Sequence, residues 1–189
     1  MKAIVISGMP AAGKTTVAKL LANKLGLSVI GGGDILKEMA KDRGYTPGGD
    51  DWWDTDDGIR FMRERETNSE FDKEADARLI KKIEAGNVVV TSYTAPWIAK
   101  DGFKIWLNAN VKNRAQRMAK RDNTGITDTI KTARIRDKEN YALYKKLYNF
   151  ELGRDTVPFD LIIDTDSIPA EEVAERILNK MKEIGLINN

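Results

Sequence analysis

The chain has 189 residues, of which 41% are hydrophobic and 32% charged, and its formal net charge is +2. This length suits one hydrophobic core with small inserts, and the charge gives no global basic field for extended nucleic-acid binding. Cysteine and histidine are both missing, which excludes disulfides, thiolate and imidazole metal sites, and histidine-dependent triads. We expect a cytoplasmic protein without a membrane span, because no apolar run approaches about 20 residues.

Short apolar runs alternate along the chain with segments of helical spacing. Runs rich in valine and isoleucine predict strands at 3–6, 28–30, 87–91, 103–107 and 159–163. They mostly lack alternation, which is typical of strands buried on both faces. Apolar residues at helical spacing predict helices at 17–25, 71–83 and 173–184. The order of elements predicts a three-layer α/β/α fold with a five-stranded parallel sheet.

A glycine-rich stretch joins the first predicted strand to the first predicted helix. It reads Gly8-Met9-Pro10-Ala11-Ala12-Gly13-Lys14-Thr15-Thr16, which matches the P-loop pattern in its required context. The glycines let backbone N–H groups curl around a phosphate, and the helix points its positive dipole end at the same place. We predict that this stretch binds ATP. Lys14 would act on the β- and γ-phosphates, and the Thr15 hydroxyl would bind Mg²⁺.

Basic residues follow the fourth predicted strand at helical spacing. Arg114, Arg117 and Arg121 share one face, and Arg134 and Arg136 come after a polar hinge at 121–128. Guanidinium groups stabilise the charge of a phosphoryl group in transfer, so Arg117 and Arg121 are predicted site residues. We interpret Arg114 by itself as part of a solvated basic helix.

Five stretches, in their order and spacing, resemble a known family. They are residues 8–16, 33–40, 104–107, 135–148 and 159–165, and the third is followed by the helix that carries Arg114, Arg117 and Arg121. The sequence is similar to the small nucleoside monophosphate kinases among the P-loop kinases, and within them to the archaeal type of cytidylate kinase. The resemblance implies phosphoryl transfer from ATP, with Mg²⁺, to CMP, with dCMP or UMP as further acceptors.

The same resemblance implies how one domain over 1–189 is organised. The core would comprise 1–33, 86–120 and 138–189, with an insert at about 34–85 that binds the monophosphate and a lid at about 121–137. By position, Arg117 and Arg121 would contact ATP and the migrating phosphoryl group, and Arg136, with Arg134, would close from the far side of the lid. Because the acceptor phosphate is itself the nucleophile, catalysis would rest on positioning and charge stabilisation.

On the acceptor side, the resemblance implies that Asp34 and Lys37 face the nucleotide. Family members usually carry arginine at the position of Lys37, and lysine lacks the planar fork. After the third strand they usually have an acidic residue and then Gly-Arg, whereas this chain has Thr-Ser-Tyr at 91–93. Asp34 would then replace the carboxylate at Mg²⁺. An insert arginine would replace the missing guanidinium: Arg63, Arg60 or Arg65.

Two other functions stay open on these residues. One is a kinase for AMP or for another small hydroxyl or phosphate acceptor. The other is an ATP-binding regulatory or nucleic-acid-associated protein without phosphotransfer, which the changed end of the third strand favours. We expect small nucleotides as partners and a monomer, with a dimer as the alternative.

Several aromatic and acidic residues allow two interpretations. Trp106 lies in a predicted strand and is interpreted as core, whereas Trp97 fits either a cover over the acceptor base or packing under the insert. Trp52 and Trp53 fit a stacking surface or a packing plug, and the carboxylates at 50–57 fit a cation site or a solvated loop. The tyrosines at 141, 144 and 148 are interpreted as helix packing.

Overall fold

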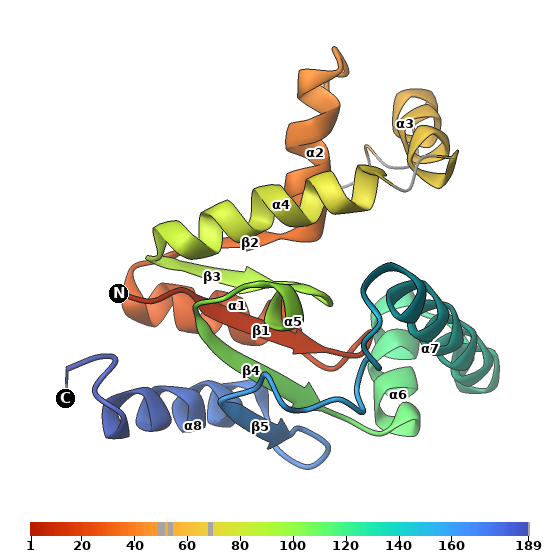
Figure 1. The fold of residues 1–189 in the computed structure, drawn as a ribbon. Helices are drawn as coiled ribbons and strands as arrows, with labels where there is room; N and C mark the ends of the chain where they lie inside the picture. The colour runs from red at the N-terminus through yellow and green to blue at the C-terminus, as the bar shows by residue number, and fades with distance from the viewer. Residues whose placement is uncertain (49–51, 53–54, 68–69, 189) are drawn as a thin grey trace.

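A parallel sheet forms the centre of the computed structural model, which describes residues 1–48, 52, 55–67 and 70–188 (Figure 1). Its strands are β1 (Ile4–Gly8), β2 (Ser28–Gly31), β3 (Val88–Thr91), β4 (Phe103–Asn108) and β5 (Leu161–Asp164). In these residues the sheet has five strands in the order β2-β3-β1-β4-β5. The predicted strands are confirmed, and only the last begins two residues later than its apolar run.

Helices cover both faces of this sheet. They are α1 (Lys14–Leu25), α2 (Gly32–Asp42), α3 (Asp56–Thr67), α4 (Glu70–Ala85), α5 (Ala95–Ile98), α6 (Val111–Asp122), α7 (Ile126–Tyr148) and α8 (Ala170–Glu183). On β1, Ile4 and Ile6 pack with α1 and α8, whereas Val5 packs with α2 and α4. This alternation follows from the two-residue period of a strand and confirms the three-layer arrangement.

The segment predicted as the insert has an aromatic core of its own. Phe61 of α3 lies 5.1 Å from Phe71 of α4 and 5.7 Å from both Trp52 and Tyr45, between ring centroids. Trp52 is only 4% exposed, which supports the packing interpretation for this residue. Trp53 and the carboxylates at 50, 51 and 54 lie outside the described residues, whereas those at 56 and 57 begin α3.

The segment predicted as the lid spans the junction of α6 and α7, which stand beyond the carboxyl ends of the strands in Figure 1. The hinge is shorter than the predicted 121–128. Asn123, with φ +51°, ends α6, and Gly125 is the N-cap of α7. The interpretation of Arg114 as a solvated residue was wrong: it is 3% exposed and forms an ion pair with Asp137 of α7.

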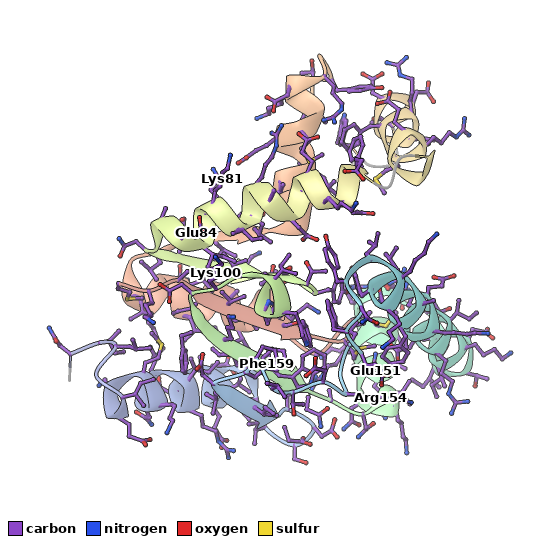
Figure 2. The ribbon with its side chains drawn as sticks, viewed as in Figure 1. Lys81, Glu84, Lys100, Glu151, Arg154 and Phe159 are labelled. Atoms are coloured by element: carbon purple, nitrogen blue, oxygen red, sulfur yellow. The ribbon has the colours of Figure 1, made fainter. Side chains whose placement is uncertain are left out.

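Beside β4 lies a second aromatic group, which decides between the two interpretations of Trp97. Its ring stacks on Phe150 at 4.2 Å, and its indole N–H donates to a carboxylate oxygen of Asp155 at 3.0 Å. Phe159, labelled in Figure 2, contacts Trp97 and Trp106 at centroid distances of 5.0 and 5.4 Å. Trp97 therefore packs within the protein, with partners in β4 and the segment after α7 where packing under the insert was predicted. Trp106 is confirmed as core at 3% exposure.

Candidate active site

The glycine-rich stretch turns sharply between β1 and α1. Gly8 and Gly13 have φ values of +154° and +101°, and a Cβ on Gly8 would lie 2.6 Å from the carbonyl oxygen of Leu107 in β4. Only glycine fits the first of these positions without displacing the neighbouring strand. The Lys14 ammonium folds back over the loop and donates to the carbonyl oxygens of Gly8 and Met9, at 2.7 and 3.0 Å.

The charge state of Lys14 is set by its surroundings. Burial of the ammonium, together with repulsion from the guanidinium of Arg114, lowers the pKa of Lys14 to about 7. The ring of Tyr93 lies 4.5 Å from the Lys14 nitrogen, in a cation–π arrangement. A phosphate at this point would favour the charged form, since an anion beside the ammonium opposes the cost of its desolvation.

A cavity of about 550 Å³ opens over the loop. It brings together two of the predicted arginines and the loop, and its lining residues are Ala11, Gly13, Lys14, Thr15, Thr16, Arg117, Met118 and Arg121. Arg117 donates to the side-chain and main-chain oxygens of Thr165, after β5. Arg121 is more exposed and pairs with the adjacent Asp122.

A smaller cavity of about 220 Å³ adjoins the first along the loop after β5. It shares Gly13, Thr16 and Arg117 with the larger cavity, and Ile168 and Pro169 add apolar surface to its wall. The two cavities together form a trough whose end at the glycine loop is cationic and whose far end is apolar. We call this trough the donor trough.

A third cavity, of about 300 Å³, lies on the other side of Lys14. We call it the acceptor cavity, and it is lined by Lys14, Gly32, Gly33, Leu36, Asp72, Ala75, Asp76, Leu79, Thr91, Ser92, Tyr93, Thr94 and Tyr144. Asp76 of α4 accepts hydrogen bonds from the hydroxyls of Thr94 and Tyr148, at 2.6 and 2.5 Å. Tyr144 and Tyr148 pack against the aromatic group beside β4, as expected. In addition, Tyr144 lines the cavity and Tyr148 bonds to Asp76.

Asp72 and Asp76 are functional candidates that the sequence reasoning missed. They lie four residues apart on α4, and Tyr144 and Tyr148 show the same spacing on α7. Residues at this spacing share one face of a helix. The four-residue spacing of these two carboxylates is visible in the sequence. The prediction for this helix rested only on the apolar stripe of 71–83, which indicates how the helix packs and says nothing about the polar face of the same helix.

The other predicted site residues lie outside these cavities. A carboxylate oxygen of Asp34 accepts from the N–H of Gly31 at 2.7 Å and so caps α2, and the Lys37 ammonium donates to the carbonyl oxygen of Gly48 at 3.2 Å. Arg63 and Arg134 are exposed, on α3 and α7. The roles predicted for these four residues at the acceptor or metal therefore remain predictions.

Arg136, which is exposed on α7, influences a tyrosine of the acceptor cavity. Burial raises the pKa of Tyr93, and the guanidinium of Arg136 opposes this rise. Arg136 thus acts electrostatically on a residue that lines the cavity. The candidate replacement Arg60 instead pairs with Asp57 at 2.9 Å and donates to the hydroxyl of Tyr45 at 3.2 Å.

A divalent cation fits this site through few protein ligands. In the part of the chain that the structure describes, no three acidic side chains gather as a metal cluster. Magnesium in phosphoryl-transfer sites takes one or two protein ligands and completes its octahedron with phosphate oxygens and water. The Thr15 hydroxyl, on the wall of the donor trough beside Lys14, is compatible with that mode.

A search of the described residues for a helix with the length and hydropathy of a membrane span found none.

Comparison with known proteins gives concordant results. The model of the cytidylate kinase-like family matches residues 3–167. A cytidylate kinase of Pyrobaculum islandicum is 35% identical over 167 residues, covering 87% of this chain and 84% of that protein. A cytidylate kinase of Archaeoglobus fulgidus is 34% identical over 181 residues, covering 95% and 94%.

Solved structures confirm the architecture. A shikimate kinase of Acinetobacter baumannii, in complex with shikimate, superposes with a TM-score of 0.59 at 21% sequence identity, covering 99% of this chain and 96% of that chain. At this identity the likeness shows a common P-loop kinase fold. The family match, which extends from β1 to the loop after β5, shows more: this chain belongs to the cytidylate kinase-like family.

Proposed function

We propose that the protein transfers the γ-phosphoryl group of ATP to CMP, with dCMP as a further acceptor, in a reaction that requires Mg²⁺. One observation carries the proposal: Lys14 lines both the donor trough and the acceptor cavity. A single cation between two cavities suits a reaction that moves one phosphoryl group from one ligand to the other. The cytidylate kinases among its relatives support CMP as the acceptor.

The donor trough accounts for ATP. The triphosphate would lie over the glycine loop, where N–H groups and the N-terminus of α1 attract anions. The adenine ring would extend toward Ile168 and Pro169, with the guanidinium of Arg117 on the shared wall. Planar guanidinium groups stack on aromatic rings as well as binding phosphate, so Arg117 suits the boundary between the triphosphate and the base.

The chemistry needs no covalent intermediate with the protein. An oxygen of the acceptor phosphate attacks the γ-phosphorus while the bond to the bridging β–γ oxygen breaks, which yields CDP and ADP. Lys14 and the guanidiniums of Arg117, Arg121 and Arg136 would neutralise the charge on the group in transfer. The Thr15 hydroxyl would hold Mg²⁺, which would supply further neutralisation when bound. We include in the proposal that the segment at 121–137 closes as a lid and excludes water.

A second acceptor class is favoured by the charges of the acceptor cavity. Among the described residues that line it, Lys14 is the cation and Asp72 and Asp76 are the anions. A phosphate dianion is repelled by nearby carboxylates, whereas a neutral acceptor that presents hydroxyl groups is not. A kinase for a small hydroxyl-bearing molecule is therefore the alternative function.

A panel of acceptors separates these functions. Purified protein with ATP and Mg²⁺ would be offered CMP, dCMP, UMP, AMP, cytidine and shikimate, with ADP formation as the readout and Lys14→Met as the inactive control. We expect the highest kcat/KM with CMP. A clear preference for cytidine or shikimate would favour the alternative, and tight ATP binding without any product would indicate a regulatory protein. The proposal also includes a cytoplasmic location and a monomeric state, and light scattering tests the monomeric state.

A further inference from the structure

Asp76 occupies a defined position in the acceptor cavity. Its carboxylate is held from two other elements, because Thr94 follows β3 and Tyr148 ends α7. Each of its two oxygens accepts one hydroxyl hydrogen bond, at 2.6 Å from Thr94 and 2.5 Å from Tyr148. A carboxylate that is fixed at both oxygens is preorganised, so it can select a ligand by the direction of its hydrogen bonds.

The two hydroxyls also keep this group an acceptor. Burial and the hydrogen bond to Asp76 raise the pKa of Tyr148 well above its usual range, so the phenol stays protonated and donates. Each oxygen of a carboxylate can accept more than one hydrogen bond, and Asp76 lines the acceptor cavity. The group therefore favours a ligand that brings an N–H or O–H donor, and it disfavours one that brings a lone pair.

Flat aromatic surfaces lie beside this carboxylate. Tyr93 and Tyr144 both line the cavity, and their rings lie 5.9 Å apart with an interplanar angle of 32°. Aromatic side chains bind the faces of nucleobases by stacking. Lys14 lines the same cavity and provides the charge for a phosphate. The cavity thus contains a surface for a base, a cation for a phosphate and a fixed hydrogen-bond acceptor.

From this arrangement we propose that Asp76 determines the specificity for the acceptor base by accepting a hydrogen bond from the exocyclic amino group of cytosine. Uracil presents a carbonyl oxygen at that position, and its lone pairs would face the carboxylate and repel it. Tyr148 is the positioning residue that holds Asp76. The inference rests on the proposed function, and it adds the residue that distinguishes CMP from UMP.

The test compares acceptors in Asp76→Asn, whose amide is nearly isosteric with the carboxylate and can also donate to a carbonyl oxygen. Steady-state kcat/KM would be measured for CMP and UMP. The ratio of the two values should fall by roughly 10- to 100-fold, as expected for the loss of a hydrogen bond to a charged group. Tyr148→Phe, which keeps the ring, should lower the ratio by a smaller factor. Glu172→Gln, on the exposed face of α8, is the matched control and should leave the ratio unchanged.

A third substrate isolates the amino group itself. Pyrimidin-2-one riboside monophosphate lacks the 4-amino group but keeps the ring, sugar and phosphate. The wild type should prefer CMP to this compound by roughly 10- to 100-fold, and Asp76→Asn should lose most of that preference. Thermal melts of each variant check folding. If Asp76→Asn failed to fold, the same comparison would be made with Tyr148→Phe.

The outcomes separate this inference from the proposed function. A wild type that prefers CMP, together with an Asp76→Asn variant that keeps the CMP:UMP ratio, would overturn the role of Asp76 and leave the proposed function standing. An unchanged ratio in folded Tyr148→Phe would overturn the positioning role. A wild type that phosphorylates no nucleoside monophosphate would overturn both the function and the inference.

Discussion

Replacing Arg114 by methionine should destabilise the protein strongly, although this residue lies on a basic helix. The guanidinium donates to both carboxylate oxygens of Asp137, at 3.0 and 2.6 Å. It also donates to the carbonyl oxygens of Ala109 and Pro10, at 3.1 and 3.2 Å. Arg114 therefore ties the glycine loop and α7 to the start of α6. Its removal leaves a carboxylate and two carbonyl groups without this donor.

The expected loss follows from the burial of the pair. The side chains of Arg114 and Asp137 are 4% and 13% exposed. Breaking such a buried pair costs about 3–5 kcal/mol, and the partial exposure of Asp137 favours the lower value. With an unfolding entropy of about 2.1 cal/mol/K per residue, the 189-residue chain should lose about 8 °C in Tm for a loss of about 3 kcal/mol.

Urea unfolding followed by circular dichroism measures this loss for Arg114→Met. The double variant Arg114→Met/Asp137→Leu should recover most of it, because an apolar pair leaves no charge buried alone. Arg176→Met is the control, since its ion pair with Glu172 on α8 is exposed and contributes little. A single variant as stable as the wild type, or a double variant no better than the single, would refute the reasoning.

Three further predictions concern the loop and its arginine. Because the pKa of Lys14 is about 7 in the free protein and a bound phosphate raises it, ATP affinity should fall as pH rises above 7. Calorimetry at pH 8 in two buffers should detect the uptake of close to one proton; no uptake would contradict this. Gly8→Ala should lower Tm more than Gly13→Ala, because the new Cβ meets a β4 carbonyl 2.6 Å away at Gly8 but open space at Gly13; equal melting temperatures would count against the steric argument. Arg117→Ala should reduce kcat/KM for ATP by roughly 100-fold, and Gln116→Ala, on the exposed face of α6, should not; similar rates in both variants would remove Arg117 from the site.

Local patterns in the chain determined the sheet, the glycine loop and their order. Strands buried on both faces need continuous apolar runs, so the run at Ile4–Gly8 and its counterparts are visible without a structure. The loop is equally local, because consecutive residues make it and its positive φ values require particular residue types. For this reason the fold and the candidate ATP site could be predicted from the sequence.

Only the tertiary structure decided which polar side chains belong together. Arg114 and Arg117 are both arginines on one face of α6. Arg114 is nevertheless buried, because Asp137, which is 23 residues further along the chain, lies opposite it. The carboxylate of Asp76 is held by Tyr148, 72 residues away. Periodicity reports which face of an element is apolar, but it carries no information about the partner that a polar group meets across the fold. Burial and pairing of charges depend on that partner, because an unpaired charge is far more costly to bury than a paired one.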